Sequence, residues 1–173
     1  RDLKAKVLEQ LGELQTLYRL SRELAYARSL PELGRAALHH LQGPVGADLC
    51  VMAVRRGDSS DVYLRSTRPL APRAIADLEQ RLGSALARLG INPPEPGYAE
   101  DLEGQPADGV QARVEALGSC YVAPLQVEGQ GLQIGVLLAA TEREEALTEN
   151  HVRLLHVAST QITEAAQRLL QPH

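Results

Sequence analysis

The sequence of 173 residues lacks Phe and Trp entirely and contains only five Tyr. Its core must therefore be built from Leu, Val, Ile and Ala, and the aromatic rings on which single-stranded nucleic acid stacks are scarce. Basic residues number 18 against 22 acidic ones, and the only lysines are Lys4 and Lys6. Because there is no excess of positive charge, we expect neither nucleic acid nor an anionic membrane as a partner.

Cysteine is also rare, since Cys50 and Cys120 are the only two and each lies within an apolar run. Buried free thiols in a reducing compartment are the favoured interpretation, which predicts a cytoplasmic location. No run approaches the ~20 apolar residues of a membrane-spanning helix, and no signal peptide is recognisable. The sequence opens on Arg1 in a helical pattern. We therefore expect a fragment of a longer protein.

The spacings that mark common active sites are missing as well. There is no nucleophile elbow, paired-cysteine redox motif, zinc-protease helix or phosphate-binding loop. The acidic cluster of Glu142, Glu144 and Glu145 is explained by a solvated turn before a helix N-terminus. We therefore predict no catalytic residues and no metal site.

A long amphipathic segment without Pro occupies residues 3–27. Apolar side chains recur there every three or four residues, which predicts a helix of ~25 residues. Two interpretations stay open: an ordinary surface helix, or the helix of a parallel dimer that continues upstream as a coiled coil. We assign residues 1–27 to a dimerisation and signalling helix and residues 28–173 to the domain that follows. The predicted homodimer contacts come from the C-terminal helix and from Leu3, Val7, Leu11, Leu14 and Tyr18.

Turn and capping residues set the remaining elements. Ser29, with a Pro and a Glu in the next turn, predicts a helix start, and Gly43-Pro44 predicts its end at about residue 42. Two hairpins are expected where apolar runs flank Gly-containing turns. The expected segments are strands 47–55 and 62–66, a helix over 72–89, a loop over 91–108, a short helix over 109–117, strands 120–127 and 132–140, and a last helix capped by Thr148.

The second hairpin, over 120–140, is apolar on both faces of its strands. Strands of that kind are covered on both sides, which predicts that this hairpin lies at the centre of the sheet. The element order then favours an α+β fold with an antiparallel central sheet. We expect the terminal helices on one face of the sheet and a helical and loop cover on the other.

Several of these segments resemble a known family. Val122-Ala123-Pro124-Leu125, Ile134-Gly135-Val136-Leu137 and the helix opening Thr148-Glu149 are similar to the C-terminal half of a GAF domain. The run Leu17–Leu24 and the helix start Ser29–Leu33 are similar to its N-terminal half, especially in bacterial sensor histidine kinases and diguanylate cyclases. The resemblance implies a GAF/PAS-like sheet of about six strands, a small-molecule pocket opposite the terminal helices, and dimerisation through those helices.

The ligand motifs that the family implies are incomplete here. Cyclic-nucleotide binding implies a motif with Phe and Lys, whereas this chain has no Phe and no Lys after Lys6. Bilin attachment implies Cys followed by His, but Cys50 and Cys120 precede Val51 and Tyr121. Methionine sulfoxide reduction implies several pocket cysteines, and the histidines on the expected helices do not offer a haem ligand. No cofactor is therefore predicted.

Strand alternation and the family resemblance together predict a mostly apolar pocket on the sheet face opposite the terminal helices. Arg68, just past the second strand, is a candidate for binding a carboxylate or phosphate, although paired surface charge is the simpler explanation. A filled core would have the same apolar composition. The predicted ligand-binding residues are Val51, Ala53, Ser66, Arg68, Tyr98, Val136 and Leu138.

The sequence thus favours a regulatory small-molecule-sensing module of a larger bacterial signal-transduction protein. Ligand binding would shift the packing of the terminal helices and so an attached output domain. A ligand-free dimerisation and spacer module is the alternative, and a small enzyme of the same fold is a third hypothesis. An unknown small molecule and a second copy of the chain are the only partners expected.

Overall fold

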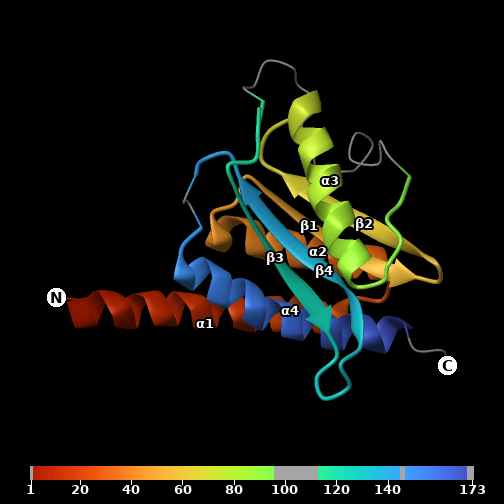
Figure 1. Cartoon of the computed structure of the whole chain (residues 1–173). Helices are drawn as coiled ribbons and strands as arrows, with labels where there is room; N and C mark the ends of the chain where they lie inside the picture. The colour runs from red at the N-terminus through yellow and green to blue at the C-terminus, as the bar shows by residue number, and fades with distance from the viewer. Residues whose placement is uncertain (1, 96–112, 145–146, 171–173) are drawn as a thin grey trace.

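A computed structural model describes residues 2–95, 113–144 and 147–170. Within these residues, the centre of the fold is a four-stranded antiparallel sheet in the order β2-β1-β4-β3 (Figure 1). The strands are β1 (Leu49–Arg56), β2 (Ser59–Ser66), β3 (Ser119–Gln126) and β4 (Gln133–Thr141).

Helices cover both faces of this sheet. α1 (Asp2–Tyr26), α2 (Leu30–Val45) and α4 (Glu149–Leu170) form one layer, and α3 (Pro72–Arg88) crosses the opposite face (Figure 1). One buried cluster lies under the three-helix layer and a second lies under α3. The predicted α+β fold, with the terminal helices together on one face, is confirmed.

The strand count differs from the family expectation of about six. In the described parts of the chain the segment before β3 adds only an isolated parallel bridge between Leu70 and Val114. A single bridge residue on each side is too short to extend the sheet as a ladder. The short helix expected over 109–117 is not present at 113–117. Its first residues, and most of the loop expected over 91–108, lie outside the described residues.

α2 begins as predicted but ends later. The Ser29 hydroxyl accepts the backbone N–H of Glu32 at 3.3 Å, which caps the helix start. The helix then continues through Pro44 to Val45, although Pro44 has no N–H to donate to the helix, and it ends at Gly46. Gly46 has φ +70° and donates its N–H to the carbonyls of Gln42 and Gly43.

The first hairpin has a tighter turn than predicted. Arg56 pairs directly with Ser59, so Gly57 and Asp58 form a two-residue turn, with φ +60° at Gly57. β2 therefore starts at Ser59 rather than at residue 62. The polar residue Ser60 belongs to the strand because it pairs with Arg55, and its hydroxyl donates to the Asn92 carbonyl at 2.9 Å.

Only one strand of the second hairpin occupies the centre of the sheet. β4 pairs with both β1 and β3 and is buried from Ile134 to Thr141. Among the described strands β3 lies at the edge, and most of its side chains are half-buried. The prediction of a central position is therefore right for β4 and wrong for β3, whose apolar side chains are covered unequally.

α1 and α4 lie side by side and run in the same direction (Figure 1). Arg153 bonds Glu13 at 3.1 Å near the start of α4, and Arg168 donates to the Leu24 carbonyl at 3.0 Å near its end. The chain thus returns to its first helix after completing the sheet. None of the described helices is long and apolar enough to cross a membrane.

Candidate functional site

The apolar residues predicted to line a pocket lie on the expected sheet face but are packed against α3. Val51 and Ala53 on β1, and Val136 and Leu138 on β4, are all at most 1% exposed. They belong to one buried cluster with three α3 side chains, Leu78, Leu82 and Leu86. Val51, Ala53 and Leu138 therefore lie in a filled core rather than in an open space.

The two polar candidates take part in a network at one end of the sheet. Ser66 donates its hydroxyl to the Arg68 carbonyl. The Arg68 guanidinium forms ion pairs with Glu142 at 2.9 Å and Asp48 at 3.5 Å. Arg68 is therefore already occupied by two carboxylates, and Tyr98 lies outside the described residues.

Glu142 connects this network to the segment before β3. It accepts the backbone N–H of Glu115 at 2.9 Å, in addition to the bond from Arg68. The backbone hydrogen bond, and then Arg68, hold the pKa of the Glu142 carboxyl below its usual range. Asp48 in turn accepts the backbone N–H of Glu142 at 2.7 Å and the Thr141 hydroxyl at 3.1 Å. The network holds together the loops that carry Asp48, Arg68, Glu115 and Glu142, so its role is to stabilise the fold.

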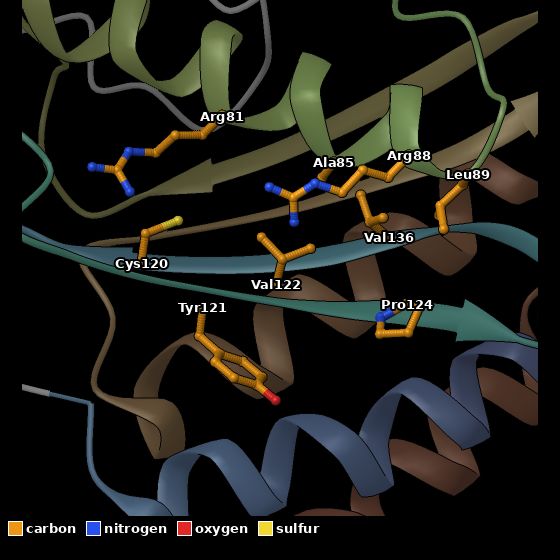
Figure 2. A pocket seen from close by; sticks show the side chains of 9 residues that line it. All are labelled: Arg81, Ala85, Arg88, Leu89, Cys120, Tyr121, Val122, Pro124 and Val136. Carbon is orange, nitrogen blue, oxygen red and sulfur yellow. The ribbon is translucent and has the colours of Figure 1, made fainter.

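An open groove of about 460 Å³ lies beside this filled face, between α3 and β3 (Figure 2). Its volume is typical of sites for small organic ligands. The described residues that line it are Arg81, Ala85, Arg88, Leu89, Cys120, Tyr121, Val122, Pro124 and Val136. Of the residues predicted from the sequence, only Val136 is among them.

The groove has a basic wall and an apolar floor. Arg81 and Arg88 extend from α3 over β3, whereas Cys120 and Val122 point from β3 toward α3 (Figure 2). Arg81 is partly neutralised, because its side chain binds Asp77 at 3.0 Å. Within the described residues Arg88 forms no ion pair.

Neither cysteine is prepared for thiolate chemistry. Burial raises the pKa of Cys50 to about 12, and that side chain is fully enclosed. Burial also raises the pKa of Cys120, although the nearby Arg81 opposes this effect. Because the thiolate is the nucleophile, these shifts reduce reactivity at neutral pH. The described residues contain no group of three His, Cys, Asp or Glu side chains that could hold a metal ion.

Tyr121 connects the groove strand to the terminal helices. It points away from α3 (Figure 2), and its hydroxyl contacts the His156 ring on α4. The two rings meet edge to face, with centroids 5.4 Å apart. β3 therefore contacts the groove through Cys120, Val122 and Pro124, and its Tyr121 hydroxyl contacts the helix layer.

The two groove arginines were not predicted from the sequence, although their spacing on the helix could have indicated them. Arg81 and Arg88 are seven residues apart on α3, and that spacing places two side chains on the same side of a helix. Ala85 leaves room between them. The pattern does not reveal which element lies opposite, so the groove itself required the tertiary structure.

A second surface feature lies along α1. Its core-facing residues in the second half, such as Leu20 and Leu24, are buried against α2 and α4. Another face of the same helix carries a stripe of apolar side chains that are exposed in the single chain. This α1 stripe comprises Leu3 (76% exposed), Val7 (47%), Leu11 (51%), Leu14 (62%) and Tyr18 (64%).

Comparisons with known structures agree with the fold. The GAF domain of a sensor histidine kinase from Pseudomonas syringae pv. tomato has a TM-score of 0.60 and 14% identity, over 97% of this chain and 95% of that one. The GAF domain of an Acinetobacter phosphoenolpyruvate-protein phosphotransferase gives 0.58 and 13%, over 90% and 92%. A free methionine-R-sulfoxide reductase from Neisseria meningitidis, in complex with its substrate, gives 0.56 and 18%, over 91% and 89%.

At these identities the solved structures show a shared fold and nothing more specific. The comparison with curated proteins finds no match. The sequence pattern of the GAF domain, however, matches residues 27–167. Because this match covers most of the sequence, the chain belongs to the GAF domain family.

Proposed function

We propose that this GAF domain is a regulatory small-molecule-sensing module of a bacterial signalling protein, which dimerises through its terminal helices and passes the ligand state to an output domain. The observation that supports this most is the exposed α1 stripe. Five large apolar side chains in water at helical spacing are costly in a single chain and are typical of a helix that pairs with another.

The geometry of α1 suits a helix with two neighbours. Each residue turns a helix by about 100°, which places the α1 stripe roughly 120° from the buried line of Leu20 and Leu24. The helix can therefore stay packed on its own domain while the stripe meets the same stripe of a second copy. α4 is bonded alongside α1, so it would take part in the same helical bundle.

The contact between Tyr121 and His156 supports a sensing role. A ligand in the groove would touch β3, and β3 is in contact with α4 through this pair. A ligand shifts an equilibrium only if it binds two arrangements with different affinity. A strand that contacts both the ligand and a terminal helix offers such a difference. The free thiols of Cys50 and Cys120 support the proposed cytoplasmic location.

A ligand-free dimerisation and spacer module is the second candidate. One observation favours it: Leu78, Leu82 and Leu86 fill the space over the sheet face where the sequence predicted a pocket. In that case the α1 stripe would act without any change at the groove. A thiol-dependent enzyme is the weakest hypothesis, because burial raises the pKa values of both cysteines.

The dimer is tested by the mass of the protein in solution, measured by light scattering during gel filtration. We expect twice the mass of one chain for the native protein, and the mass of one chain for Leu14→Glu, because a carboxylate in the middle of a buried seam loses its hydration. Ala5→Glu is the matched control, since Ala5 is exposed on the other side of α1. A native monomer at high concentration, or equal effects of both variants, would contradict the proposal.

A further inference from the structure

The groove between α3 and β3 is positively charged. Two arginines and no acidic residue are found among the described residues that line it. Asp77 offsets the charge of Arg81, whereas Arg88 has no such partner in the described parts of the chain. A neutral or cationic occupant would leave the Arg88 guanidinium without a counter-charge once water is displaced, which is unfavourable.

The arrangement of the groove selects for an elongated molecule with an anionic end. The two arginines are two turns apart on α3, or roughly 10 Å along the helix axis. Between and below them the surface is apolar, formed by Ala85, Val122 and Pro124 (Figure 2). Guanidinium groups bind carboxylates and phosphates through two parallel hydrogen bonds, which fixes the orientation of such a ligand.

We infer that the groove binds a small organic anion, with a carboxylate or phosphate monoester held by Arg88 and a short apolar body on Val122, Pro124 and Val136. Arg81 provides a second, weaker contact because it is shared with Asp77. This inference rests on the proposed sensing function, since it names the chemical class of the ligand. Arg68, the candidate from the sequence, does not compete for this role because Asp48 and Glu142 already bind it.

The test uses three probes with the same eight-carbon chain: nonanoate, octyl phosphate and the neutral 1-octanol. Backbone amide shifts of the isotope-labelled protein are followed by NMR during titration. We expect both anions to shift the amides of β3 and of the second half of α3, and 1-octanol to bind at least about tenfold more weakly. The anion that binds with the higher affinity identifies the preferred head group.

Matched variants on α3 locate the site. Arg88→Gln should weaken both anions by about tenfold or more. Arg73→Gln makes the same change at an exposed position near the start of α3, outside the groove, and should leave affinity unchanged. Ala85→Trp should abolish binding without removing a charge, because the indole would fill the space between the two arginines.

Several results would overturn the inference. These are equal binding of 1-octanol and the anions, amide shifts away from α3 and β3, no binding of any probe, or equal affinities in Arg88→Gln and Arg73→Gln. The mass of each sample is measured in parallel by light scattering. If the protein is a dimer that binds no anion, the ligand class is rejected and the proposed dimerisation is still supported. If it is a monomer that binds anions, dimerisation is rejected and the ligand class is still supported.

Discussion

At the scale of single residues, glycine decides how closely β1 and β4 approach. A Cβ atom built at Gly135 would lie 2.0 Å from the carbonyl oxygen of Ala53, far inside the 3.0 Å below which real contacts essentially never occur. Backbone on the neighbouring strand cannot move away as a flexible side chain can. The close approach of the two central strands therefore depends on this residue.

We predict that Gly135→Ala lowers the free energy of unfolding by more than about 2 kcal/mol, because the sheet must open to admit a methyl group. Gly12→Ala is the matched control. No atom lies within 4 Å of the Cβ position there, and Ala is favoured over Gly inside a helix by about 1 kcal/mol. Urea unfolding followed by circular dichroism measures both. Equal stabilities for Gly135→Ala and the native protein would show that the strands are further apart than described.

At the scale of elements, the Arg68 network holds the ends of strands and loops together. Glu142 follows β4, Arg68 follows β2, and Asp48 precedes β1. These residues are far apart in the sequence, and Glu115 joins them through its backbone N–H. The network therefore contributes to the tertiary arrangement rather than to any one element.

Acid should weaken this network. Because the pKa of Glu142 is lowered in the folded protein, its contribution to stability is full above the ordinary Glu pKa of about 4.3 and is lost as pH falls through the folded value. We predict that Glu142→Gln reduces stability at pH 7 by about 1 kcal/mol or less, as for exposed ion pairs, and makes the decline below about pH 5 shallower. Urea titrations at several pH values measure the decline.

Glu144→Gln is the control for this pH dependence, since it removes an exposed carboxylate from the same turn. It should leave the decline as steep as in the native protein. If Glu142→Gln behaved in the same way as Glu144→Gln, the bonds to Glu115 and Arg68 would contribute nothing to folding.

Some element boundaries were predictable from residues that are close in sequence. The start of α2 at Ser29 follows from a local hydrogen bond to Glu32. The start of β2 was predicted too late, because a two-residue turn pairs Ser59 with Arg56. Ser60, although polar, also donates its hydroxyl to the carbonyl of Asn92, 32 residues further along the chain. Local patterns cannot report such a partner.

At the scale of the whole molecule, the terminal helices form one parallel pair. The first turns of α1 are exposed on all sides, and its contacts with α4 begin at Glu9 and Glu13, which bind Asn150 and Arg153. In the proposed dimer the two copies of α1 would pair in parallel, so that each stripe residue faces the same residue of the second copy. A change in the packing of α1 and α4 would then pass along both terminal helices to an attached output domain.

Cross-linking tests this orientation. We predict that Leu3→Cys forms a disulfide-linked dimer under mild oxidation, because a parallel seam brings the two Cα atoms within the range of 4.4–6.8 Å that a disulfide requires. Ala5→Cys, which lies on a different side of α1, should link poorly. Non-reducing gel electrophoresis measures both. Efficient linking of Ala5→Cys with little linking of Leu3→Cys would exclude the parallel seam.

The α+β class, the long N-terminal helix and the shared face of the terminal helices were predictable from the sequence. Periodicity and caps act over a few residues, and they are visible without the fold. Strand alternation also placed Val51, Ala53, Val136 and Leu138 together on one sheet face. The assignment of ligand-binding residues stays a prediction, and Tyr98 lies outside the described residues.

Where that sheet face is filled and where it is open became known from the fold alone. α3 lies over β1 and β4 and buries Leu78, Leu82 and Leu86 against them, which leaves the groove beside β3. The position of a helix across a sheet depends on how side chains distant in sequence pack together, and no local pattern reports it. For the same reason Arg68 proved to be paired with Asp48 and Glu142, while Arg88 was left facing the groove.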